Sequence, residues 1–195
     1  MKSSRPYFST AIATILIVMF AVAAQATAPR GWFVAGSKPQ SYESGLDPST
    51  PHMEHASAYL KAKSSSVDGF GTLMQHFRAD HYLGKRVRFS AFVKTADAKN
   101  WAGLWMRVDK GQNSVAFDNM QDRPIRGDTD WRKCEVVLDV PQDATGVFFG
   151  VLLAGGGEVW INDAKIEVVG GEVPPTGGAQ NHAMTDEPEN LDFKE

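Results

Sequence analysis

The sequence predicts an all-β protein with the architecture of a jelly-roll β-sandwich. Three observations support this fold class. Apolar and polar residues alternate with a period of two in many short runs, and Gly, Pro and Asp separate these runs about every ten residues. No stretch combines a helical period with helix caps. Short alternating strands at this spacing are typical of two packed antiparallel sheets.

The expected strands follow one another along the chain. Their residue ranges are 57–62, 71–78, 86–95, 101–108, 114–117, 131–140, 146–154, 158–161 and 165–169. Alternation is clearest in the third run, where Val87 and Phe89 share an apolar face. The run 146–154 is apolar on both faces, which predicts a central strand covered on both sides. Three glycines, Gly155-Gly156-Gly157, predict a flexible hairpin turn into the next strand.

The first 26 residues have the features of a secretory signal peptide. Lys2 and Arg5 precede an uncharged run over 11–24, and Ala24-Gln25-Ala26 forms a signal-peptidase site. The alternative is an uncleaved membrane anchor, but the apolar run is shorter than the roughly 20 residues that span a bilayer. We expect cleavage after Ala26 and a periplasmic or secreted protein with no membrane attachment afterwards.

The composition changes again near the C-terminus, which leaves residues 30–170 as the predicted jelly-roll domain. Residues 171–195 contain few apolar side chains and an acidic stretch at 186–189, as expected for a flexible acidic tail. Two alternatives stay open for this tail. The more apolar run 190–193 would dock as an extra strand, or the tail would be the remnant of a linker to another domain.

The net charge indicates which class of partner is excluded, and the cysteine content indicates the role of the single thiol. The 195 residues carry a net charge of −3, and the pI of about 6.0 argues against a nucleic-acid partner. Removal of residues 1–26 leaves 18 of the 20 basic and all 23 acidic residues, a net charge of −5. Cys134 is the single thiol and alternates in phase with Val136 and Leu138, so we expect it to be buried in the core.

Motifs for catalysis are missing, so we predict that the protein is not an enzyme and needs no cofactor. The sequence has no nucleophile elbow, phosphate-binding loop, dinucleotide fingerprint or zinc-protease motif. His52 with His55, and His76 with His81, are expected to be solvated loop residues. Asp118 with Asp122, and Asp128 with Asp130, are expected to form turns, because nothing indicates two carboxylates across a cleft.

One strand carries the best candidate for a binding surface. In 101–108, one alternating face is apolar, whereas Trp101, Trp105 and Arg107 point to the other face. Indole rings stack on sugar rings and other flat groups, and a guanidinium supplies forked donors beside them. The alternative is that loops cover the indoles and make them a second minor core.

A polar segment after the following strand supplies candidate hydrogen-bonding residues. Asp118, Asn119, Gln121 and Arg123 would orient a hydroxyl-rich ligand, or they would satisfy the backbone of a long loop. Asp163, a single aspartate in a turn, is a candidate ligand of a structural calcium ion.

Six segments of the chain form a recurring set of motifs: 31–37, 42–45, 71–75, the G-L-W-M-R-V-D run 103–109, the F-D-N-M-x-x-R-P-I run 117–125, and 160–163. These motifs resemble those of a bacterial galactose-binding-like jelly-roll domain, which occurs alone and fused C-terminally to the helix-turn-helix part of some AraC-type transcriptional regulators. The resemblance covers about residues 30–170. The chain departs at Glu54, where similar domains usually have Gly. The resemblance implies a jelly roll of the carbohydrate-binding-module type with a ligand-binding role.

These observations predict an exported, non-catalytic module that binds a carbohydrate or another small ligand on the Trp101, Trp105 and Arg107 face. The alternative is a periplasmic protein-interaction or structural domain. A label of transcriptional regulator would then be inherited from the fused relatives, because the acidic sequence shows no helix-turn-helix and we expect no DNA binding.

Overall fold

The predicted all-β jelly roll is confirmed by a computed structural model, which describes residues 27–177. The signal-peptide prediction for 1–26, and the part of the tail prediction that concerns 178–195, lie outside the described residues. The strands are β1 (Phe33–Gly36), β2 (Tyr42–His52), β3 (His55–Ala62), β4 (Phe70–Arg78), β5 (Lys85–Lys110), β6 (Asn113–Asp118), β7 (Ile125–Val140), β8 (Gly146–Ala154) and β9 (Glu158–Val169). Two 3₁₀ turns, Pro39–Ser41 and Ala79–His81, add to them. Within 27–177, no helix is long and apolar enough to cross a membrane.

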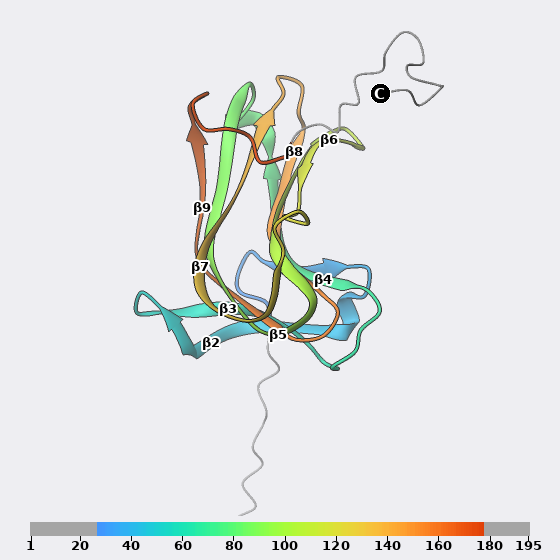
Figure 1. Cartoon of the computed structure of the whole chain (residues 1–195). Helices are drawn as coiled ribbons and strands as arrows, with labels where there is room; N and C mark the ends of the chain where they lie inside the picture. The colour runs from blue at the N-terminus through green and yellow to red at the C-terminus, as the bar shows by residue number, and fades with distance from the viewer. Residues whose placement is uncertain (1–26, 178–195) are drawn as a thin grey trace, which may run out of the picture.

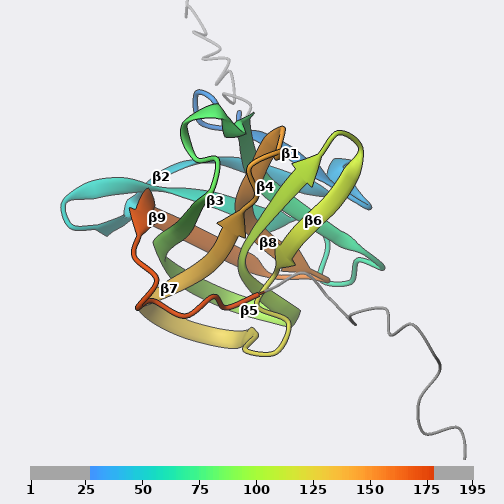
Figure 2. The same ribbon diagram turned by 90° about the horizontal axis from the view of Figure 1, so that it is seen from above.

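The long strand β5 joins two antiparallel layers. Its first half pairs with β7 and β9, and β9 continues to β3 and β2; we call this layer sheet II. Its second half, 101–110, pairs with β6 and β8, and β8 continues to β4 and β1; we call this layer sheet I. Figure 1 shows β5 curving around the base of the domain, and Figure 2 shows the strands on either side of it.

The core lies between the two sheets and follows the predicted alternation. Val87 and Phe89 of sheet II, and Leu104 and Met106 of sheet I, have no exposed surface. Cys134 is buried in the same cluster, as predicted, and burial raises the pKa of its thiol. The sequence therefore identified correctly which face of β5 is the inner one.

Three features of the strands differ from the prediction. The runs 86–95 and 101–108 belong to one strand, β5, and the runs 158–161 and 165–169 belong to β9. β1 and β2 were not predicted. The predicted central position of 146–154 is confirmed, because β8 lies between β4 and β5.

The triple-glycine segment is a turn that connects β8 to β9, but the predicted hairpin is wrong, because β8 and β9 lie on either side of β5 and do not pair with each other. Gly155 and Gly157 have φ angles of 78° and 110°, which L side chains rarely adopt. A side chain on Gly156 would lie 2.2 Å from the carbonyl oxygen of Ser65. Tyr42 donates a 2.8 Å hydrogen bond to the Gly155 carbonyl, so β2 is attached to this turn.

The described part of the predicted tail, 171–177, lies along sheet II; we call it the C-terminal segment. Its Thr176 N–H donates to the Val137 carbonyl at 2.9 Å, and the Val137 N–H donates to Thr176 Oγ1 at 2.8 Å. Arg86 donates to the carbonyl oxygens of Gly171 and Val173. The chain thus stays hydrogen-bonded to the domain as far as Thr176, six residues beyond the predicted boundary at 170.

Candidate functional site

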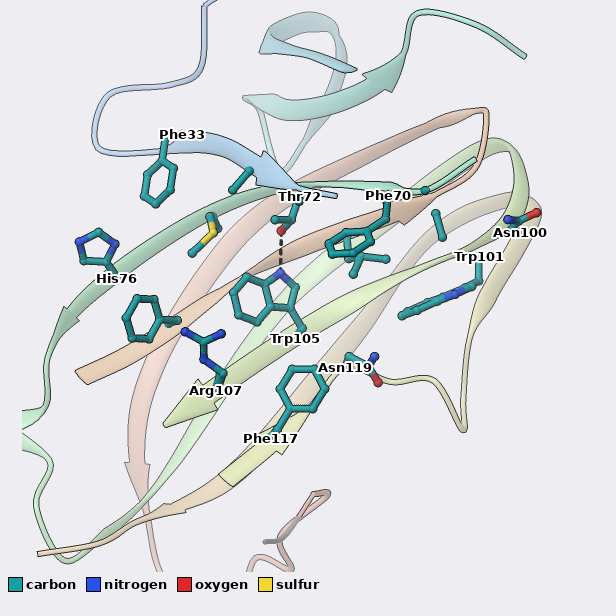
Figure 3. A pocket seen from close by; sticks show the side chains of 17 residues that line it. Phe33, Phe70, Thr72, His76, Asn100, Trp101, Trp105, Arg107, Phe117 and Asn119 are labelled. Carbon is teal, nitrogen blue, oxygen red and sulfur yellow. Dashed lines mark hydrogen bonds between the residues drawn. The ribbon is translucent and has the colours of Figure 1, made fainter. Parts of the chain in front are cut away.

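The outer face of sheet I is hollowed into a pocket of about 940 Å³. The lining residues come from the five strands of this sheet and the loops beside them. They are Phe33, Ala35, Gly36, Gly69, Phe70, Thr72, Met74, His76, Asn100, Trp101, Trp105, Arg107, Phe117, Asn119, Phe148, Leu152 and Ala154. Figure 3 shows their side chains, with Trp105 near the middle.

Strand register explains why these side chains meet. Trp105 pairs with Gly150 of β8, Gly150 pairs with Met74 of β4, and Met74 pairs with Phe33 of β1. Directly paired residues point to the same face of a sheet. Each position of the outer face of β5 therefore begins a row of side chains that crosses the pocket.

Trp105 forms the floor of the pocket. Its indole Nε1 donates a 2.6 Å hydrogen bond to Thr72 Oγ1 on β4, across the intervening strand β8, and Thr72 donates onward to the Val151 carbonyl at 2.9 Å. The ring is 8% exposed and packs with Met74 and Leu152. Trp105 thus contributes an apolar surface with a satisfied N–H, and it belongs to a small second core beneath the pocket.

Trp101 forms a wall at one end of the pocket and is only partly buried. Its ring lies beside Gly103, where an added Cβ would be 3.4 Å from the indole and 3.3 Å from the Asn119 carbonyl oxygen. The glycine therefore lets the loop after β6 approach the strand. Asn100 and Asn119 flank this end, and their amides are its polar groups.

Arg107 lies at the opposite end of the pocket. Its guanidinium carbon is 4.6 Å from the ring centroid of Phe148, within the range of a cation–π contact. The His76 ring packs 5.3 Å from the Phe148 ring between centroids, and it also packs edge-on against Phe33 at 5.5 Å. Arg107 Nη2 donates a 2.8 Å hydrogen bond to Asp109, which fixes the orientation of the guanidinium.

The predicted hydrogen-bonding residues after β6 are divided between the pocket and the loop. Asn119 lines the pocket, whereas Asp118, Gln121 and Arg123 are outside the lining. Arg123 donates from Nη2 to Asp118 Oδ2 at 2.5 Å and from Nη1 to Asp118 Oδ1 at 3.3 Å. The Thr176 hydroxyl donates to Asp118 Oδ2, and the Met120 N–H donates to Oδ1.

This arrangement fits the interpretation that the polar segment satisfies its own loop. Burial by itself would raise the pKa of Asp118, but the hydrogen bonds from Arg123, Thr176 and Met120 outweigh it and lower the pKa. Gln121 is exposed and its N–H donates to Asn119 Oδ1. Contact of Asp118, Gln121 or Arg123 with a ligand stays a prediction.

Asp163 lies in β9 with a φ of 50° and forms an ion pair with Lys165 at 3.2 Å. In the described part of the chain, no group of three or more His, Cys, Asp or Glu side chains is placed to hold a metal ion. The calcium role of Asp163 therefore stays a prediction that rests on the sequence.

Sequence reasoning missed four aromatic lining residues. Phe33, Phe70 and Phe148 were not singled out, and His76 was assigned to a solvated loop. A local signal exists for His76, because it alternates in phase with Thr72 and Met74 along β4. Phe70 shares this signal on β4, whereas Phe33 and Phe148 join the site only through strand pairing.

Comparison with solved structures identifies the class of fold. The CBM22-1 xylan-binding domain of Xyn10C from Paenibacillus barcinonensis matches 74% of this chain over 90% of its own length, with a TM-score of 0.53 and 11% identity. The enzymatically active domain of tailspike protein 4 from bacteriophage CBA120 matches 72% of this chain over 20% of its own length, with a TM-score of 0.52 and 14% identity. The chain therefore has the jelly-roll fold of carbohydrate-binding modules.

The sequence itself is similar to an uncharacterized HTH-type transcriptional regulator, YbfP, from Bacillus subtilis. The two are 44% identical over 168 residues, which cover 85% of this chain and 57% of the regulator. No family model matches the chain. The predicted resemblance to jelly-roll domains that occur in transcriptional regulators is thus confirmed, and the chain spans just over half the length of this relative.

Proposed function

We propose that this protein is a non-catalytic, exported binding module that holds a carbohydrate or a similar small ligand in the pocket of sheet I. The pocket itself is the observation that carries the proposal, because its floor and walls are mainly aromatic and a few polar side chains stand at its two ends. Mostly apolar pockets with a few placed polar groups are typical ligand sites. The likeness in fold to a xylan-binding domain supports a sugar as the ligand.

The geometry suggests how a sugar would be held. The apolar face of the ring would stack on Trp101, while the amides of Asn100 and Asn119 would bond to hydroxyl groups. Trp105 would support the ring from below, because its N–H already bonds to Thr72. No Asp or Glu lines the pocket in the described part of the chain, which supports binding without hydrolysis, since glycosidases use two carboxylates.

Replacing Trp101 with alanine is expected to weaken sugar binding by about tenfold or more, because loss of a tryptophan that packs on the ligand commonly costs more than about 1.4 kcal/mol. A glycan array would first identify a bound sugar. Isothermal titration calorimetry on the purified chain would then give Kd for the parent and for Trp101→Ala.

Trp131→Ala is the matched control for this variant. Trp131 lies on β7 in sheet II, where its ring packs 5.0 Å from His52, so its loss leaves the pocket intact. Equal affinities of parent and Trp101→Ala would contradict the proposal. A glycan array without any bound sugar would also contradict it. Specific capture of a periplasmic protein would then favour an interaction domain. Phe33 and Phe117 provide exposed rings at the two pocket edges for such a contact.

The name of the relative favours a second candidate, a ligand sensor in transcriptional regulation. In residues 27–177 the helical elements are two 3₁₀ turns, so this part of the chain offers no helix-turn-helix. In a regulator, this part of the chain would bind the ligand in its pocket and would not contact DNA through a helix-turn-helix.

The purified chain is accordingly expected not to bind duplex DNA. In a gel-shift assay, its lane should match the lane of free DNA at low and at physiological salt, with and without a bound sugar. A shift that weakens as salt rises would show a phosphate-contacting protein and overturn this expectation.

A further inference from the structure

The two ends of the pocket differ in their hydrogen-bonding chemistry. The Trp101 end has the amides of Asn100 and Asn119, which both donate and accept. The Arg107 end has a guanidinium, which only donates, beside the His76 imidazole, whose nitrogens donate and accept, while the side chains of Phe33, Phe117 and Phe148 have no polar atoms. A ligand group that bonds to Arg107 must therefore supply acceptors.

Arg107 is also the one charged side chain that lines the pocket among the described residues. Its pairing with Asp109 uses Nη2 alone, and Nη1 makes no hydrogen bond within the described part of the chain. The Arg107 side chain is 39% exposed, whereas that of Asp109 is 11% exposed. Asp109 thus orients the guanidinium through one nitrogen, and the more exposed Arg107 lines the pocket.

Packing on Phe148 makes this guanidinium a prepared anion site. The stacked ring holds the planar group at 4.6 Å and removes water from one of its faces. A preorganised guanidinium binds a carboxylate or a sulfate more strongly than it binds a neutral hydroxyl, because the hydrogen bonds are charge-assisted. The aromatic surroundings strengthen this preference by lowering the local dielectric constant.

We propose that the pocket selects an acidic sugar, with the carboxylate or sulfate on Arg107 and a sugar ring toward Trp101. This inference rests on the proposed function and specifies its ligand. It also specifies how the ligand is oriented in the pocket, with the anionic group at the Arg107 end and neutral hydroxyls at the Asn100 and Asn119 end.

The test compares sugars that differ only in charge. Galacturonate and glucuronate trimers, their carboxyl-reduced counterparts and a sulfated galactose trimer would be titrated calorimetrically into the full chain. We expect an acidic trimer to bind about tenfold or more tightly than its neutral counterpart. Arg107→Gln should remove this difference, because it weakens binding of the acidic trimer far more than binding of its neutral counterpart. The uronate and sulfate arms identify which anionic group is preferred.

Lys165→Gln is the control, because it removes the same charge from β9 in sheet II and should preserve the preference. Binding of neutral and acidic trimers with equal affinity would overturn the inference and leave the proposed function standing. An acidic preference that persists in Arg107→Gln would also overturn it. Failure of every trimer to bind would overturn this inference, whereas the proposed function would be contradicted only by a glycan array without any bound sugar. Raising the salt concentration should weaken acidic binding in the parent and have little effect in Arg107→Gln.

Discussion

Replacing Phe89 with alanine is expected to lower the free energy of unfolding by about 3–5 kcal/mol. Phe89 lies in the first half of β5, has no exposed surface and contacts Phe149 of sheet I at 5.0 Å between ring centroids. Phe149 in turn packs against Trp32 and Phe77. The substitution would open a cavity between the two sheets that the surrounding rings cannot fill. Urea denaturation followed by circular dichroism would measure the change.

Phe117→Ala provides a matched control on the same fold. Phe117 is 45% exposed at the edge of sheet I, so the same change of side chain removes little buried surface and should alter stability far less. If both variants lost similar stability, the assignment of Phe89 to a shared core would be wrong. A large loss confined to Phe89→Ala would support the sandwich in which β5 contributes to both layers.

The alternating pattern was enough to predict the sandwich and the inner face of β5. A period of two identifies which residues face the core regardless of which strands pair. Phe89 and Leu104 could therefore be placed on the buried side from local sequence alone.

Strands with an interrupted pattern could not be predicted in the same way. β2 contains Gly45, Pro48 and Pro51, which are typical of turns, but it lies at the edge of sheet II, where proline is tolerated. In β5, the polar stretch around Asp97 resembles a loop. It is a bulge, with a φ of 52° at Asp97 and a shift of register between Thr95 and Ala98, and the strand continues into sheet I.

The same limit explains how much of the pocket the sequence could predict. Trp101, Trp105 and Arg107 lie on one strand, so alternation alone placed them on one face. Phe33 and His76 reach the same face through the pairing of β1 with β4 and of β4 with β8. Strand order and register depend on residues that are far apart in the chain. The sequence alone therefore does not show which rows of side chains meet.

The residues after β6 illustrate a different limit, because one set of polar groups suits a ligand and a loop equally well. The structure brings Asp118, Arg123 and Thr176 together, and Thr176 comes from the C-terminal segment 58 residues later. Asp118 is the centre of this cluster, and its side chain is 6% exposed. The cluster joins the loop that carries Asn119, at the edge of the pocket, to the C-terminal segment.

Replacing Asp118 with alanine is therefore expected to lower the free energy of unfolding by about 2–4 kcal/mol at neutral pH, because it leaves Arg123, Thr176 and the Met120 N–H without their acceptor. The pKa of Asp118 is lowered in the folded protein, so its contribution is complete above the unfolded value of about 3.9. It is lost as the pH falls through the folded value. The stability gap between parent and variant should accordingly be widest near pH 7 and should narrow below about pH 4.

Asp122→Ala separates this network from an ordinary surface pair. Asp122 accepts a hydrogen bond from the same arginine at 2.7 Å, but its side chain is 74% exposed, so its loss should change stability little. Chemical denaturation at pH 7 and pH 3.5 would measure both variants. A gap for Asp118→Ala that did not change with pH would contradict the role of the ionised carboxylate. If Asp118→Ala instead kept full stability and lost only sugar affinity, Asp118 would contact the ligand directly, and the binding site would extend from the pocket into this loop.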